Sequence, residues 1–337
     1  MGNHGFNSSV LEQARGARIL VAITVHFNPT RVGFLAEVLR SLANFPVAAM
    51  DVVLITNTFG EVELELLRRL CDEIFPDRNT SIRSHGDLAH PFDLTWCHKA
   101  IIAKEFAGEN DGKYTHFIYL EDDIRLDFAN FCYFVDFRER LNGAGVLPSF
   151  LRVEYSAALN GFVSTDMVAP VNVIEQPHID IGETVLVNPP NPYTACFILD
   201  TRLAGEYVLT RSFERGKSRA VSDMDVRERA AMGLCHENVP KSFQSRYVVP
   251  FSKTAGMALN CAWISHLPNN YANDPNIGFG KIRMDSLFVT TSRDHTAAVT
   301  EGPGRRTDEA EGQIARRGRN IANKVIEGLR WRLGFKR

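Results

Sequence analysis

The residues best suited to chemistry are three adjacent acids, Glu121, Asp122 and Asp123, which directly follow an apolar stretch at 116–120. Neighbouring carboxylates repel one another, and a hard divalent cation with oxygen ligands neutralises them effectively. Ligands of open α/β sheets bind at the carboxyl ends of strands. The pattern therefore predicts a metal or substrate site, and the alternative is a solvated acidic loop after a strand.

A histidine later in the chain could join these acids. His266 follows a short apolar segment at 263–265. Neutral imidazole is a borderline ligand that suits Mn²⁺ better than Mg²⁺, so a pairing with the acids predicts a preference for manganese. The alternative is a surface or hydrogen-bonded histidine that holds no ligand.

A second group of acids lies in a predicted helix at 222–232. Asp225 and Glu228 are three residues apart, so a helix places both on one face. The alternative is a charged helix whose acids are satisfied by Arg227, Arg229 and the helix dipole.

Alternating strand and helix patterns in the first half of the chain must position the acids. Apolar, partly β-branched runs are typical of strands buried on both faces, and apolar residues at helical spacing follow them. The predicted strands are 19–25, 52–56, 81–84 and 116–120, and the predicted helices are 32–42, 62–75 and 96–106. This βαβαβαβ order predicts a parallel, doubly wound sheet with the three acids at the end of its fourth strand.

The second half of the chain is less regular. Strand patterns at 150–155 and 195–199 precede the helix at 222–232, and mixed α/β patterns continue to about residue 290. Apolar periodicity is then lost around Gly302-Pro303-Gly304, which indicates a linker. The expected organisation is a flexible N-terminus at 1–16, one α/β domain at 17–290, a linker at 291–311 and a basic amphipathic helix at 312–337.

Composition and missing motifs exclude several classes of protein. Lys and Arg number 38 against 40 Asp and Glu, a net charge of −2, so there is no electrostatic basis for binding nucleic acid. No G-x-G-x-x-G follows the first predicted strand, and Gly216-Lys217-Ser218 lacks the upstream glycine of a P-loop. The six cysteines include no CxxC pair, so neither a zinc ribbon nor a disulfide framework is indicated.

The acidic triplet at the end of a fourth strand resembles the GT-A family of nucleotide-sugar-dependent glycosyltransferases, in which a D-x-D element ends a strand at this depth. Glu121-Asp122-Asp123 is similar to the E-D-D variant of certain N-acetylglucosaminyltransferases. The pattern covers about residues 17–290, and its one short motif specifies a superfamily and no substrate. The resemblance implies a Rossmann-like GT-A fold, with a central, mostly parallel sheet flanked by helices and a smaller mixed half on the acceptor side.

The same resemblance implies a metal site. Asp123 would bind Mn²⁺ or Mg²⁺ directly, His266 would be a further metal ligand, and Glu121 and Asp122 would act through water or on the ribose. A divalent cation that bridges two phosphates neutralises the nucleoside diphosphate as it leaves.

The resemblance also implies contacts with the donor nucleotide. Thr24, His26 and Asn57 lie at the ends of the first two predicted strands, where nucleoside contacts are expected. His98 and Lys99, at the helix that leads to the acidic strand, could hold a diphosphate. The alternative for these two residues is an ordinary helix N-terminus.

A catalytic base is implied for an inverting enzyme. Asp225 or Glu228 would take the proton of the acceptor hydroxyl as the anomeric carbon is attacked, whereas a retaining enzyme needs no such base. The stereochemical outcome therefore stays open at this point.

The C-terminal segment 312–337 predicts a peripheral membrane contact. It carries eight basic residues and one acid, Glu327, a net charge of +7. Its apolar residues recur every four positions, at Ile321, Val325, Leu329 and Leu333. A basic amphipathic helix of this kind can lie on an anionic membrane surface, and the alternative is docking on an acidic domain. The first 18 residues show no signal-peptide pattern, so we expect a cytoplasmic protein at the inner face of the membrane.

The combined prediction is a metal-dependent glycosyltransferase that moves a sugar from a nucleotide diphosphate donor to a hydroxyl acceptor, such as a cell-envelope or surface glycan or glycolipid. One alternative is a sugar nucleotidyltransferase or metal-dependent phosphoesterase. A nucleotidyltransferase should carry a Gly-rich basic turn after its first strand, and residues 26–33 offer only Arg31 as a cation. The other alternative is a non-catalytic membrane-surface or carbohydrate-binding protein with a structural cation.

Overall fold

The computed structural model of the chain describes residues 5–106 and 112–290. The chain divides into two units, Met1–Thr291 and Ser292–Arg337, and every described residue belongs to the first. Within the described ranges, no helix is both long and apolar enough to cross a membrane.

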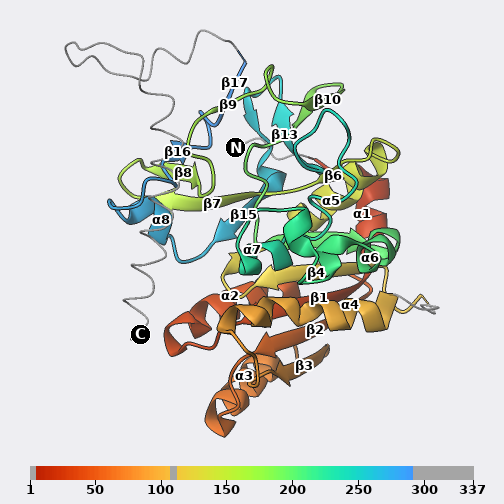
Figure 1. Cartoon of the computed structure of the whole chain (residues 1–337), viewed down its shortest axis with the longest axis vertical. Helices are drawn as coiled ribbons and strands as arrows, with labels where there is room; N and C mark the ends of the chain where they lie inside the picture. The colour runs from red at the N-terminus through yellow and green to blue at the C-terminus, as the bar shows by residue number, and fades with distance from the viewer. Residues whose placement is uncertain (1–4, 107–111, 291–337) are drawn as a thin grey trace. The chain divides into compact units, whose positions relative to one another are not determined.

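The principal sheet has five strands in the order β12-β4-β1-β2-β3 (Figure 1). Its strands are β1 (Arg18–Val25), β2 (Ala49–Thr56), β3 (Asn79–Ser84), β4 (His116–Glu121) and β12 (Cys196–Asp200). The first four are parallel to one another, and β12 is antiparallel to β4. β1 lies in the middle and is buried at every position except Arg18, which is why its sequence is a continuous apolar run. The predicted mixed α/β fold with a mostly parallel sheet is confirmed.

Helices connect these strands and cover both faces of the sheet. They are α2 (Val32–Ala43), α3 (Glu61–Ile74) and α4 (His98–Phe106), with the short 3-10 helices η1 (Pro29–Arg31) and η2 (Pro91–Trp96) before α2 and α4. The chain steps from β1 to β2 and β3 in one direction and then returns past β1 to β4. Because such crossovers are right-handed, α4 covers the face opposite to α2 and α3. This reversal places a crevice at the carboxyl ends of β1 and β4, where ligands of such sheets bind.

The second half of the unit contains shorter strands in three further sheets. Their orders are β16-β8-β7-β15-β5, then β10-β11-β13-β14 with β6 beside β13, and β17-β9. The strands are β5 (Ile124–Arg125), β6 (Leu147–Pro148), β7 (Leu151–Ser156), β8 (Gly161–Ser164), β9 (Val171–Asn172), β10 (His178–Ile181), β11 (Thr184–Val187), β13 (Tyr247–Ser252), β14 (Met257–Ala258), β15 (Trp263–His266), β16 (Ile282–Arg283) and β17 (Phe288–Val289). The helices are α5 (Phe128–Arg140), α6 (Thr201–Val208), η3 (Arg211–Phe213), η4 (Ser218–Ala220), α7 (Val226–Ala230), η5 (Asn260–Ala262) and α8 (Asn270–Asn273).

Helix α5 links the two halves of the unit. Every residue from Asn130 to Phe137 is buried, as is typical of a helix surrounded by the core on all sides. The amide nitrogen of Asn130 donates hydrogen bonds of 2.8 Å to the carbonyl oxygens of Cys261 and Trp263. The helix therefore fixes the start of β15, the strand that ends in His266.

The predicted ends of the domain need one correction. Residues 1–16 are predicted to be flexible, but Ser8–Arg15 forms the helix α1, capped by the side chain of Asn7. Val10 and Ala14 on this helix are buried, and α1 packs against α5, so this part of the prediction is wrong. The linker and the basic helix predicted beyond residue 290 lie outside the described residues.

The predicted helix at 222–232 is shorter in the structure. α7 spans only Val226–Ala230 and has Asp225 as its N-cap. The side chain of Asp225 accepts a hydrogen bond from Val226 N, and the side chain of Glu228 accepts one from Asp225 N at 3.1 Å. This reciprocal capping box defines where the helix begins.

The half-buried histidine His116 predicts a loss of stability in acid. Burial between Phe131 and Phe134 lowers the pKa of His116 to about 4. In the unfolded chain, His116 binds a proton below about pH 6.5, whereas in the folded chain it binds one only near pH 4. The free energy of unfolding therefore falls as the pH drops from about 6.5 to about 4. Between pH 7 and pH 5, we expect the free energy of unfolding of His116→Gln to fall by about 1–2 kcal/mol less than that of the wild type. Urea unfolding at the two pH values measures this difference.

The matched control for this measurement is His178→Gln, because His178 is exposed. This variant should keep the pH dependence of the wild type. An unchanged pH dependence in His116→Gln would contradict the assignment of His116 as a buried neutral imidazole.

Candidate active site

The backbone brings two distant parts of the chain together at the carboxyl end of β4. Asp122 N donates to Thr24 O of β1 at 3.2 Å. β5 follows directly and pairs with β15, so that Ile124 lies opposite His266. Leu267 N then donates to Asp123 O at 2.9 Å. The acids that end β4 and the histidine that ends β15 are therefore neighbours because of strand pairing.

The side chains of Asp123 and His266 face each other. Asp123 Oδ2 lies 3.5 Å from His266 Nε2, and both side chains are almost fully buried. On its other side, His266 Nδ1 contacts Oε1 of Glu154, a residue of β7 that is 1% exposed. Tyr271 stacks on the imidazole with ring centroids 4.9 Å apart and an interplanar angle of 9°. The ring of His266 is thus held by a carboxylate and an aromatic face, with Nε2 directed at Asp123.

An arginine covers the acids from the solvent side. Arg31, at the end of η1, contacts both carboxylate oxygens of Asp122, and its Nη2 lies 2.7 Å from Asp123 Oδ2. The side chain of Arg31 is 34% exposed, whereas those of Asp122 and Asp123 are 3% and 7% exposed. The partly exposed guanidinium of Arg31 therefore neutralises the charge of two buried carboxylates, those of Asp122 and Asp123.

The charges in this cluster shift the pKa values of its members. Burial raises the pKa of Asp122, and the contact with Arg31 opposes this effect. Burial alone would also raise the pKa of Asp123, but the hydrogen bond to His266 and the charges of His266 and Arg31 lower it. The pKa of His266 is raised because Asp123 and Glu154 outweigh its burial. Asp123 is consequently ionised at neutral pH.

A second ion pair lies beside this cluster. Arg152 of β7 binds Asp166 through two nitrogens, at 2.5 and 3.0 Å, and both side chains are buried. The guanidinium lies 4.8 Å from the ring centroid of Tyr193 and 5.9 Å from that of Tyr271. Tyr193 in turn donates from its hydroxyl to Glu121 Oε1 at 3.2 Å. The pair thus forms one wall of the acidic site.

Positive charge gathers at the end of β1. Burial lowers the pKa of His26 to about 4, and the charges of Arg227 and Arg31 contribute to this shift. Arg227 comes from α7, and Glu121 raises its pKa although burial opposes that effect. Within the described residues, Arg227 Nε has no hydrogen-bond partner. The site therefore holds an arginine whose Nε is unbonded, close to the acid that ends β4.

The predicted nucleoside contacts lie at the expected edge of the sheet. His26 follows β1, and Asn57 follows β2. Asn57 Oδ1 accepts a hydrogen bond of 3.0 Å from Phe27 N, which holds the turn after β1. Thr24 is 2% exposed. Their roles toward a nucleotide stay predictions.

His98 and Lys99 are not exposed in the crevice. His98 is fully buried, with its Nδ1 2.6 Å from Thr95 O and its ring 4.4 Å from that of Tyr119. Lys99 is 5% exposed, donates to Ser212 O and lies 3.7 Å from the ring centroid of Trp96. Because both side chains are buried with partners from the protein, this placement argues against the predicted diphosphate contact.

The two candidate bases occupy different positions. Asp225 is exposed and caps α7. Glu228 is half-buried and lies close enough to Tyr193 and Arg227 to raise the pKa values of both. Of the two, Glu228 is therefore the one with electrostatic contact to the acidic site.

A divalent cation needs several oxygen or nitrogen ligands, and the site offers few of them. The described residues contain no group of three or more His, Cys, Asp and Glu arranged to hold a metal ion. Asp123 and His266 do form a carboxylate–imidazole pair, and Glu154 orients the imidazole as a second-shell carboxylate does in metal sites. A pair of protein ligands fits a cation that completes its coordination with phosphate oxygens and water.

Several residues of the site were not among the sequence candidates. Arg31 is the one Arg or Lys in the turn after the first predicted strand, and Arg227 is a neighbour of the predicted acids. Glu154 and Arg152 alternate with apolar residues on a short predicted strand, a pattern that predicts one shared face toward the acceptor. No local signal marks Tyr193, which reaches the site from the connection between β11 and β12, or Tyr271, which reaches it from α8.

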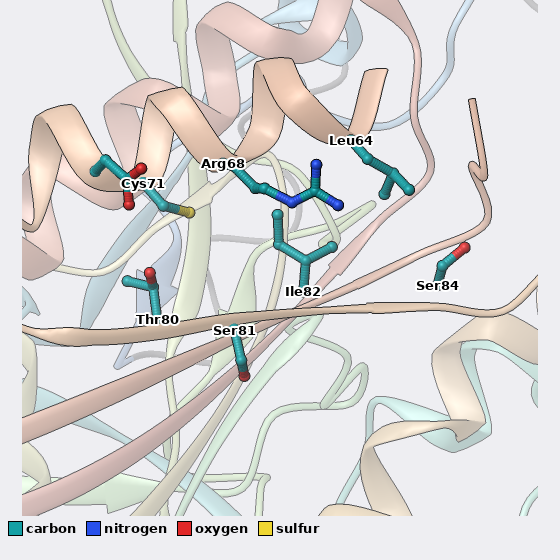
Figure 2. A pocket seen from close by; sticks show the side chains of 8 residues that line it. Leu64, Arg68, Cys71, Thr80, Ser81, Ile82 and Ser84 are labelled. Atoms are coloured by element: carbon teal, nitrogen blue, oxygen red, sulfur yellow. The ribbon is translucent and has the colours of Figure 1, made fainter. Parts of the chain in front are cut away.

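A separate hollow of about 350 Å³ lies away from the acids, between α3 and the edge strand β3 (Figure 2). Leu64, Arg68 and Cys71 enter it from the helix, and Thr80 and Ile82 from the strand. Because β1 and β2 separate β3 from β4 in the sheet, this hollow is not part of the acidic site.

Comparisons with known proteins add little to this description. No protein-family model matches the chain, and no curated protein matches it. Among solved structures, residues 1–349 of the S. aureus glycosyltransferase TarS match with a TM-score of 0.36 and 11% sequence identity. The match covers 68% of this chain and 57% of the TarS chain, so this chain spans less than two thirds of that structure.

The buried ion pair predicts a large difference between two similar substitutions. Arg152→Gln leaves Asp166 buried without its partner and should lower the free energy of unfolding by about 3–5 kcal/mol. Arg283→Gln removes an equivalent Arg–Asp contact, with Asp285, in which both side chains are about half exposed, and should change stability little. Urea unfolding of both variants tests this prediction. Equal losses in the free energy of unfolding would show that the Arg152–Asp166 pair stabilises the fold no more than the exposed pair does.

Proposed function

We propose that this protein transfers a sugar from a nucleoside diphosphate donor to a hydroxyl acceptor, with a divalent cation held by Asp123 and His266. The observation that carries the proposal is the Asp123–His266 pair, oriented by Glu154, in the crevice where the strand order reverses. A carboxylate and an imidazole are a suitable donor set for Mn²⁺. When bound, the cation would neutralise the charge of the departing diphosphate.

Residues of the chain would bind and orient the donor. Arg31 and Arg227 approach His26 from two different elements, and guanidinium groups form strong, often bidentate hydrogen bonds with phosphate. Glu121, at the end of β4, is held by the Tyr193 hydroxyl and is a candidate for a contact with the ribose. These roles support binding of an anionic nucleotide in the crevice.

A carboxylate near the acceptor would serve as the general base if the reaction inverts the anomeric centre. Glu228 fits this role better than Asp225, because it lies near Tyr193 and Arg227 while Asp225 is exposed. It would accept the proton of the acceptor hydroxyl as the new glycosidic bond forms. A retaining reaction would leave this residue without a catalytic role.

The acceptor we propose is a glycan or glycolipid of the cell envelope or surface. This part rests on the basic sequence at 312–337, which suits an anionic membrane surface. Liposome flotation of the full chain and of a chain ending at 311 tests it. Equal lipid binding by both would remove the membrane surface from the proposal.

Asp123→Asn should abolish both metal-dependent donor binding and sugar transfer. A ligand in hundredfold excess over its Kd stabilises the native state by about 2.7 kcal/mol. We therefore expect one class of nucleotide sugar to raise the unfolding temperature of the wild type only with Mn²⁺, and Asp123→Asn to lose this shift. Asp285→Asn, at an exposed acid, is the control and should retain it. A persistent shift in Asp123→Asn would exclude Asp123 as the metal ligand.

Glu228→Gln and Asp225→Asn separate the two candidate bases. Gln and Asn both preserve the capping box, so neither substitution should disturb α7. For an inverting enzyme we expect Glu228→Gln to lower kcat by about 10²–10⁴-fold and Asp225→Asn to leave it nearly unchanged. Product formation from the donor found in the previous experiment gives the rates. Full activity of Glu228→Gln would remove it as the base.

A further inference from the structure

Arg31 already occupies the carboxylates that a divalent cation would approach. Its guanidinium contacts both oxygens of Asp122 and also Asp123 Oδ2, the same oxygen that faces His266 Nε2. A guanidinium carries its charge at any physiological pH. A metal ion on Asp123 would therefore lie within a few ångströms of a fixed positive charge and would be repelled by it.

The exposure of the three side chains indicates which of them can move. The acids are almost fully buried at the end of β4 and the start of β5, whereas Arg31 is 34% exposed and extends from a three-residue 3-10 helix. The backbone of Asp122 and Asp123 is fixed by hydrogen bonds with Thr24 and Leu267. When a divalent cation enters, the side chain of Arg31 is thus the one that can move away from the two carboxylates.

The surroundings of Arg31 offer a second position for it. Its charge acts on His26, as does that of Arg227 from α7. Two guanidinium groups near one imidazole repel each other unless an anion lies between them. A diphosphate bound there would give Arg31 a new anionic partner in place of Asp122 and Asp123.

We propose that Arg31 is an exchangeable counter-ion: it holds Asp122 and Asp123 in the free protein and passes to the diphosphate when the divalent cation binds. This inference rests on the proposed function, because it requires that cation and diphosphate share the crevice. Its consequence is coupled binding. The cation alone must compete with Arg31 and binds weakly, whereas cation and diphosphate together bind tightly, and each raises the affinity for the other by the same factor.

The experiment measures Mn²⁺ binding directly, by electron paramagnetic resonance of free Mn²⁺ and by calorimetry, with and without micromolar inorganic pyrophosphate. The proteins are the full chain and its variants Arg31→Gln, Arg31→Lys and Asp123→Asn. Arg69→Gln is the matched control for net charge, because Arg69 is an exposed arginine on α3. Thermal unfolding of each variant confirms that it is folded.

We expect Arg31→Gln to bind Mn²⁺ alone about tenfold more tightly than the wild type, within the 5- to 150-fold range typical of couplings between sites. The gain that pyrophosphate gives should shrink in this variant. Arg31→Lys keeps the competing charge and should stay within about twofold of the wild type for Mn²⁺ alone. If Arg31 only supported the structure of the site, Arg31→Gln would weaken Mn²⁺ binding both with and without pyrophosphate. Tighter binding of Mn²⁺ alone, together with a smaller gain from pyrophosphate, therefore identifies Arg31 as a competitor of the cation.

Three results would overturn the inference. If Mn²⁺ binds to the wild type through Asp123 but Arg31→Gln binds it no more tightly, Arg31 is not its competitor, and the proposed function survives. If neither protein shows Mn²⁺ binding that Asp123→Asn removes, both the inference and the metal-dependent function fail. Tighter binding by Arg31→Lys as well as Arg31→Gln would also count against a charge-based exchange.

Discussion

The site depends on the need to neutralise carboxylates that the fold buries. Strand β4 continues the apolar core directly into the three acids, and the last two, Asp122 and Asp123, are almost fully buried where the strand ends. An unpaired buried charge is very costly, and the chain supplies cations from two directions, Arg31 on the solvent side and His266 from within. The result is a buried row of alternating charges.

The fold makes this row possible through connections that are distant in sequence. Strand pairing between β5 and β15 places His266 beside Asp123, and α5 fixes β15 through the amide of Asn130. Glu154, on the neighbouring strand β7, completes the row beyond the histidine. Asp123, His266 and Glu154 come from different elements. The geometry of the site therefore depends on how the second half of the unit packs.

The parts of this arrangement that could be predicted from sequence are those with a local cause. The apolar runs of β1, β2 and β4 come from burial on both faces, and three consecutive acids after such a run are visible without a structure. The burial of His98 and Lys99 was not predictable, because each occupies a helical position whose solvent exposure depends on η2 and η3 packing over it. The contact of Arg31 with the acids crosses about 90 residues and has no local signal. The predicted helix at 222–232 also begins too early, because the capping box of α7 starts at Asp225.

The charges of the row also constrain what can bind to it. In the free protein the cations Arg31 and His266 already offset most of the charge of Asp122, Asp123 and Glu154, and Arg152 offsets Asp166. A divalent cation that binds Asp123 and His266 displaces the proton of His266, so it adds one net positive charge to a site that already contains Arg31. Arg227, with Nε unbonded among the described residues, adds further positive charge. A ligand with several negative charges is the partner that restores the balance, which is why a diphosphate and a metal ion are expected to bind here together and each only weakly alone.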